Sequence, residues 1–126
     1  MKLLIDTHIL LWWLSDDAKL TENAHQLIAT PDNAIFVSHA SLWEIQIKAM
    51  VGKLTANLQD IIQQLPENNF QQLPIHANHL LALGMLPQHH QDPFDRMLIA
   101  QASHEPMHLL THDQQLGNYS ELVILV

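Results

Sequence analysis

Short apolar segments alternate along this chain with longer, more polar segments that carry a helical pattern. The apolar segments cover residues 2–6, 34–38, 71–75, 108–111 and 122–126. The first, second and last are nearly continuous in Leu, Ile, Val and Phe, as strands buried on both faces should be, whereas the third is weak. Strands that alternate with helices predict an α/β fold with a central, mostly parallel sheet of four to five strands.

The segments between these runs contain start and stop signals for helices. The expected helices cover about residues 7–14, 21–30, 38–50, 57–65, 76–83 and 92–104, with Thr7, Thr21, Ser38 or Ser41, and Asp92 as N-caps and with Pro66 and Gly84 as stops. The last start is the strongest, because Asp92 can cap the helix and Pro93 suits its first position. In such sheets, ligands bind beyond the carboxyl ends of the strands, where the strand order reverses.

The composition is that of a single globular domain over residues 1–126. Hydrophobic residues make up 48% and charged residues 14%, which excludes a disordered chain. The lack of cysteine excludes disulfides and thiolate metal sites. No apolar run approaches the ~20 residues that span a bilayer, and Asp6 follows too soon for a signal peptide. We therefore expect a cytoplasmic protein with no membrane partner.

The net charge of −8 restricts how this chain could bind nucleic acid. Its fixed positive charges are Lys2, Lys19, Lys48, Lys53 and Arg96. A sequence-independent nucleic-acid binder normally presents a basic face, because phosphate contacts dominate its affinity. Any nucleic-acid role must therefore rest on a metal ion, these few cations, a basic partner or some of the ten histidines.

Four acidic residues lie where the expected elements change direction: Asp6, Glu44, Asp95 and Asp113. Asp6 and Asp113 end strand-like segments, so they become neighbours if their strands are adjacent. Glu44 lies about a turn into the helix after the second strand, and Asp95 lies in the first turn of the helix before the fourth. A cluster of carboxylates is costly unless a cation holds it. The acids therefore predict a divalent-metal site, and their oxygen donors suit Mg²⁺ or Mn²⁺.

These acids also have purely structural explanations. Asp6 could stabilise a helix N-terminus through the helix dipole. Glu44 could pair with Lys48 at i+4, worth roughly 0.3–0.5 kcal/mol, although its apolar neighbours also favour an inward position. Asp113 could cap a short turn over residues 114–116.

The segment before Arg96 contains two acids that need separate interpretations. Asp92 directly precedes Pro93, so a role as helix N-cap explains it fully. Beside the metal, Asp92 would at most support the residues that bind the ion. Asp95 falls at N3, where an acid can complete a capping box, yet we favour it as a ligand. Arg96 could pair with an acid or touch a phosphate.

Thr7, Thr111, His8 and His112 lie within two residues of candidate ligands. A threonine hydroxyl in such a place can hydrogen-bond a ligating carboxylate. We expect the two histidines to contact substrate phosphate or a carboxylate, and not to bind metal.

Other histidine pairs, His76/His79 and His89/His90, could suggest zinc. Neither pair matches a His-Glu-x-x-His arrangement, and His76/His79 suits a solvated helix face. A histidine metal site is therefore not expected.

The tryptophans, Trp12, Trp13 and Trp43, could stack on bases. At these spacings such residues more often belong to the core or to an interface. The segment 10–14 is apolar nearly all round, which predicts a buried helix or one covered by a partner.

The chain resembles a known family in several motifs that span nearly its whole length. These are Leu-Leu-Ile-Asp-Thr-His-Ile-Leu-Leu-Trp at 3–12, Ser-Leu-Trp-Glu-Ile at 41–45, Lys48 with Gly-Lys-Leu at 52–54, His-Gln-Asp-Pro-Phe-Asp-Arg-Met-Leu-Ile-Ala-Gln-Ala at 90–102, and Thr-His-Asp at 111–113. Together, in order and spacing, they resemble the PIN-domain family, and within it the VapC toxins of bacterial type II toxin–antitoxin pairs.

The resemblance implies a three-layer PIN-like domain and a Mg²⁺ or Mn²⁺ site whose acidic positions fall on Asp6, Glu44, Asp95 and Asp113. It further implies endoribonuclease activity on RNA that leaves a 5′-phosphate and a 3′-hydroxyl, a cognate antitoxin and a homodimer. Relatives often carry Arg near Gln91 and His112. This chain lacks those cations, which bears on substrate affinity more than on chemistry.

Alternative classes also place acids at the carboxyl ends of parallel strands. A receiver-like Mg²⁺-binding signalling module needs paired acids after its first strand, but Asp6 is followed by Thr7 and His8. A haloacid-dehalogenase-type phosphatase needs Asp-x-Asp and fails in the same way. A catalytically weak antitoxin-binding protein is the third alternative, and the presence of all four acids argues against it.

Overall fold

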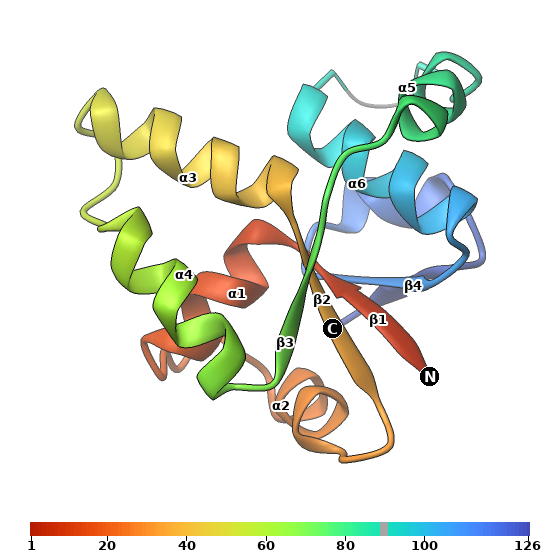
Figure 1. Cartoon of the computed structure of the whole chain (residues 1–126). Helices are drawn as coiled ribbons and strands as arrows, with labels where there is room; N and C mark the ends of the chain where they lie inside the picture. Colours follow the sequence, from red (N-terminus) through yellow and green to blue (C-terminus); the bar gives the residue numbers. More distant parts are fainter. Residues whose placement is uncertain (89–90) are drawn as a thin grey trace.

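The computed structural model describes residues 1–88 and 91–126, which form a parallel sheet covered by helices on both faces (Figure 1). The strands are β1 Lys2–Ile5, β2 Ala34–Ser38, β3 Phe70–Leu73, β4 His108–Thr111 and β5 Val123–Leu125. The helices are α1 Thr7–Leu14, α2 Glu22–Ala29, α3 His39–Met50, α4 Leu58–Glu67, α5 Ala77–Gly84 and α6 Pro93–His104, with a 3₁₀ turn η1 at Gln114–Asn118. His89 and His90, which the sequence raised as a zinc pair, lie outside the described residues.

The strand order is β3-β2-β1-β4-β5, and every neighbouring pair is parallel. The predicted α/β fold is therefore confirmed, with a sheet that is wholly parallel over these strands. The chain builds outward from β1 through β2 to β3 and then returns to place β4 on the other side of β1. The strand order thus reverses between β1 and β4, where α/β proteins bind ligands.

Two hydrophobic layers hold the helices against the sheet. Leu3 and Ile5 of β1 face one layer, which α1, α2 and α4 complete, while Leu4 faces the other, which α6 completes. Figure 1 shows α1 and α4 on one side of the strands and α5 and α6 on the other. Because β1 is covered on both sides, its three apolar residues are fully buried, as its continuous apolar run predicts.

Several element boundaries differ from the sequence prediction. Asp6, and not Thr7, is the N-cap of α1, since its Oδ1 accepts a hydrogen bond from the Ile9 N–H at 2.8 Å. Ser38 caps α3, while Ser41 is buried inside that helix.

The predicted boundaries around α4 and β3 were also displaced. Pro66 lies inside α4, one residue before its end, and so it does not stop the helix. The strand β3 begins at the buried Phe70 and ends before Pro74, because proline has no N–H to donate to a strand ladder. Over the described part of the chain, none of the helices has the length and apolar character needed to cross a membrane.

Candidate metal centre at the carboxyl edge of the sheet

Asp6 occupies the reversal point, directly after β1, with only 4% of its surface exposed. Its N–H donates to the Leu110 carbonyl of β4 at 3.1 Å, which ties the ends of the two strands together. One carboxylate oxygen caps α1, and the other accepts a hydrogen bond from Thr111 Oγ1 at 2.5 Å. The side chain is therefore held in one orientation by two donors.

The surroundings of Asp6 disfavour its charged form. Burial raises the pKa of the Asp6 carboxyl above its ordinary value of 3.8, and the Glu44 carboxylate raises it further. The hydrogen bonds from Thr111 and Ile9 lower this pKa and offset part of the effect. A buried acid next to a second acid is a position where a bound cation would restore the ionised form.

Glu44 lies in α3 and is also 4% exposed. Its Oε1 accepts a hydrogen bond from Thr7 Oγ1 at 2.6 Å, and its Oε2 accepts one from Lys48 Nζ at 2.7 Å. The pair with Lys48 expected from the i+4 spacing is thus present. This ion pair does not prevent Glu44 from pointing inward, because its two carboxylate oxygens have separate partners.

Lys48 connects Glu44 electrostatically with the first turn of α6. The hydrogen bond to Glu44 raises the pKa of the Lys48 ammonium, and the charges of Asp92 and Asp95 raise it further. Asp92 caps α6, since its Oδ1 accepts from the N–H groups of Phe94 at 2.8 Å and Asp95 at 3.2 Å. Asp95 itself is half-buried in that first turn.

Arg96, which the sequence proposed as a partner of an acid or of a phosphate, makes two hydrogen bonds to described residues from its guanidinium group. Its Nη1 donates to the Pro87 carbonyl at 3.0 Å and to the Tyr119 hydroxyl at 3.4 Å. These contacts connect α6 with the segments on either side of it.

Asp113 follows β4 and caps η1, because its Oδ1 accepts from the Gln115 N–H at 3.0 Å. Its own N–H donates to Thr111 Oγ1 at 3.1 Å. The Thr111 hydroxyl thus donates to Asp6 and accepts from Asp113, so it joins the two acids that end neighbouring strands. Asp6 and Asp113 also line one open cavity of about 280 Å³, together with His8, Trp12 and His112.

The geometry brings most of the predicted residues into one region. Asp6 and Asp113 share a cavity and a threonine, and Glu44 acts electrostatically on Asp6. Asp95 lies close enough to raise the pKa of Lys48, and Lys48 is hydrogen-bonded to Glu44. This all-oxygen donor set fits a hard divalent cation such as Mg²⁺ or Mn²⁺.

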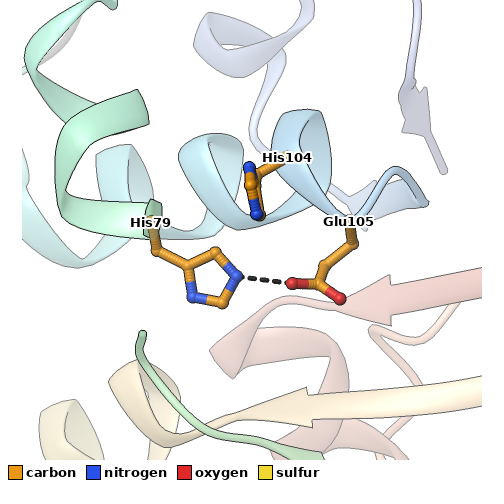
Figure 2. A group of neighbouring side chains, drawn as sticks. All are labelled: His79, His104 and Glu105. Carbon is orange, nitrogen blue, oxygen red and sulfur yellow. Dashed lines mark hydrogen bonds and ion pairs between the residues drawn. The ribbon is translucent and has the colours of Figure 1, made fainter. Parts of the chain in front are cut away.

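A second group of side chains, His79, His104 and Glu105, lies at the opposite end of α6 (Figure 2). Their potential ligand atoms all lie within 4.8 Å of one another. The prediction of a solvated face for His79 is wrong, since the packing of α5 against α6 leaves it 0% exposed. No periodicity in the sequence signals this burial.

The hydrogen bonds of His79 do not suit a metal ligand. Its Nδ1 accepts the His76 N–H at 3.0 Å, so the proton of the neutral ring sits on Nε2. Nε2 lies 2.5 Å from Glu105 Oε2, which accepts that proton, as the dashed line in Figure 2 marks. A ligating histidine instead needs a lone pair on the metal-facing nitrogen and a proton on the other. The group therefore has a structural role, in which a hydrogen bond connects α5 with the end of α6.

Comparison with known families gives one match over most of the chain. The model of a family described as the PIN domain matches residues 3–122. No curated protein sequence is significantly similar to the chain.

Solved structures with the same fold cover nearly all of the chain. The VapBC2 structure from Rickettsia felis, bound to a DNA fragment from its promoter, has a TM-score of 0.73 at 18% identity and covers 100% of this chain and 98% of its own. VapBC-1 from nontypeable Haemophilus influenzae has a TM-score of 0.65 at 19% identity, covering 99% and 98%. A toxin–antitoxin complex from Klebsiella pneumoniae has a TM-score of 0.63 at 22% identity, covering 96% and 94%. At such identities the likeness establishes the fold.

Proposed function

Because this chain belongs to the PIN-domain family, we propose that it is a metal-dependent endoribonuclease and the toxin of a type II toxin–antitoxin pair. The observation that carries this proposal is the buried Asp6 at the sheet reversal, joined to Asp113 through Thr111 and facing the same cavity. The buried Asp6 carboxylate also lies in the field of Glu44, and such an acid is stabilised as an anion by a nearby cation.

In this proposal Asp6, Asp95 and Asp113 hold Mg²⁺ or Mn²⁺, and Glu44 completes the site or helps to hold a second ion. When bound, the ion supplies the charge that activates a water molecule and stabilises the phosphate during an in-line attack. The protein orients the ligands: Thr111 and the Ile9 N–H fix Asp6, while Thr7 and Lys48 fix Glu44. The carboxylates do not act as nucleophiles, and the expected products carry a 5′-phosphate and a 3′-hydroxyl.

An antitoxin is the proposed protein partner, supported by the toxin–antitoxin complexes that share this fold. A homodimer is also part of the proposal. The sequence predicted that the apolar segment 10–14 is either buried or covered by a partner, and its residues 11–14 are half-buried. Residues 10–14 pack onto the core layer formed with α2 and α4. Large exposed apolar side chains also lie on α3 and α5 or directly after them: Trp43, Ile47, Met50, Val51, Leu80, Leu81 and Met85.

The test is RNA cleavage by variants that remove one ligand charge. Asp6→Asn and Asp113→Asn should each abolish Mg²⁺-dependent cleavage while circular dichroism shows an intact fold, because Asn can still cap a helix. Asp32→Asn, an exposed acid elsewhere on the chain, is the matched control and should cleave normally. Retained Mg²⁺-dependent cleavage in both variants would show that Asp6 and Asp113 are not required metal ligands.

The same assay separates the alternatives. A catalytically weak antitoxin-binding protein would bind its partner and show no cleavage with any divalent ion. A receiver-like module would bind Mg²⁺ and leave RNA intact, and the match to the PIN domain over residues 3–122 favours the nuclease over it.

A further inference from the structure

The cavity beside the candidate metal centre has an aromatic wall. Two of its lining residues are the acids Asp6 and Asp113, and the other three are the rings of His8, Trp12 and His112. Its volume of about 280 Å³ lies just below the range of ~300–1,000 Å³ typical of small-molecule pockets. That is room for one small planar group next to the acids, and too little for a helix.

The three rings form a contiguous surface. His8 and Trp12 are four residues apart on α1 and therefore share a face, with ring centroids 5.8 Å apart. His112 comes from the loop after β4, and its ring centroid lies 5.6 Å from that of Trp12 at an interplanar angle of 71°. The wall thus combines the helix that follows β1 with a residue that follows the neighbouring strand β4.

Two contacts hold this wall in place. Trp12 is half-buried and packs partly against the core layer beneath α1, so only part of its indole faces the cavity. His112 Nδ1 is hydrogen-bonded to the main-chain oxygen of Val126. This main-chain oxygen can only accept, so Nδ1 carries a proton and the contact restrains the ring. Rigid, partly exposed rings are well suited to stacking, since little conformational entropy is lost on binding.

We propose that this cavity is a nucleobase subsite, in which the base next to the phosphate at the metal centre stacks on Trp12 between His8 and His112. The proposal rests on the function proposed above and adds how the substrate is held. With a net charge of −8, the chain has few phosphate contacts to offer. Stacking on an aromatic face needs no cation and accepts any base. Base stacking was one of the roles that the sequence left open for Trp12, and it is compatible with the partial packing of Trp12 against the core.

The first experiment compares two ligands on the wild-type protein. Isothermal titration calorimetry with Mg²⁺ present would measure the affinity for AMP and for ribose 5-phosphate, which share the phosphate and the sugar but differ in the base. Stacking of one base changes affinity by roughly 5- to 150-fold, so AMP should bind at least about fivefold more tightly. Equal affinities would overturn the proposal without the use of any variant.

Substitutions then locate the effect. Trp12→Leu removes the ring and should make the two ligands bind equally, whereas Trp12→Phe should keep most of the preference for AMP. Trp13→Leu is the matched control, because Trp13 lies on the same helix but packs against His25 and Phe70. If Trp12→Leu does not fold, the exposed His8→Ala substitution provides the test and should lower the preference for AMP severalfold. An AMP preference that survives in both Trp12→Leu and His8→Ala would also reject the subsite.

The outcomes distinguish this inference from the function on which it rests. RNA cleavage without a base preference would leave the nuclease standing and remove the subsite, and the cavity would then be open to a side chain of the protein partner. A Trp12-dependent preference for AMP without RNA cleavage would support the subsite and reject the nuclease.

Discussion

At the scale of single residues, the Thr111 hydroxyl is the group that contacts two of the proposed metal ligands at once. It donates its one proton to Asp6 and accepts the N–H of Asp113, so it fixes the relative positions of two proposed ligands. A hydroxyl that supports a ligand in this way acts on metal affinity without touching the metal.

Thr111→Val keeps the shape of the side chain and removes both hydrogen bonds. We expect Mn²⁺ affinity and RNA cleavage to fall by about 10–100-fold, and the free energy of unfolding to fall by about 1–3 kcal/mol because buried partners lose their hydrogen bonds. Titration calorimetry and urea unfolding measure the two effects. Thr111→Ser is the control and should restore both. Full metal affinity in Thr111→Val would show that the hydroxyl has no positioning role.

At the scale of the elements, helix caps and proposed ligands turn out to be overlapping sets. Asp6, Asp92 and Asp113 each cap the N-terminus of a helix or turn, α1, α6 and η1 respectively. The capping contacts known for Asp6 and Asp113 each use one carboxylate oxygen. A structural explanation of an acid in the sequence therefore does not exclude a functional one. The helix N-termini also add positive potential on the side where anions would bind.

Asp92→Ala tests the capping part alone. It should lower the free energy of unfolding by about 1 kcal/mol, the usual effect of losing an N-cap, and it should weaken cleavage by loosening the turn that holds Asp95. Asp92→Asn retains an accepting oxygen and should behave as the wild type in both respects. Urea denaturation and cleavage rates are the measurements, and equal losses in the two variants would mean that the charge, and not the cap, matters.

The elements themselves could largely be predicted from the sequence, whereas several contacts could not. Continuous apolar runs and cap residues are local signals, and they predicted the alternation of strands and helices. The burial of His79 depends on the packing of α5 on α6, and the contact of Trp12 with His112 depends on β1 pairing with β4. Those are tertiary events with no local pattern. Asp6 and Asp113 were predicted because strand ends converge in any parallel sheet, whereas Glu44 and Asp95 depended on the family resemblance. Thr111 as the shared partner of Asp6 and Asp113 needed coordinates.

At the scale of the whole molecule, the candidate site makes stability depend on pH. The folded pKa of Asp6 is raised by burial above its ordinary value of 3.8, so the folded state binds this proton more tightly than the unfolded state. The contribution of Asp6 is therefore favourable at low pH and is lost as the pH rises through the window above 3.8. Wherever Asp6 is ionised, the metal-free protein carries the cost of a buried charge.

We expect the metal-free wild type to lose free energy of unfolding between about pH 4 and neutrality, and Asp6→Asn to lose less. Added Mn²⁺ should restore the stability of the wild type at neutral pH and leave Asp6→Asn nearly unchanged, because a bound ion stabilises only the form that binds it. Urea unfolding across this pH range, with and without Mn²⁺, is the measurement. Identical pH profiles for both proteins would contradict the role given to Asp6.

The pairing of β1 with β4 also has a consequence for how the protein is made. The hydrogen bond from Thr111 to Asp6 joins residues 105 positions apart, and the strand that carries Thr111 pairs next to the first strand of the chain. Contacts of such long range form late, because closing a long loop costs entropy before the contact rewards it. During translation, Asp6 and Glu44 leave the ribosome long before Asp113 does. A nascent or prematurely terminated chain therefore lacks an assembled candidate centre, which is completed only when β4 pairs with β1.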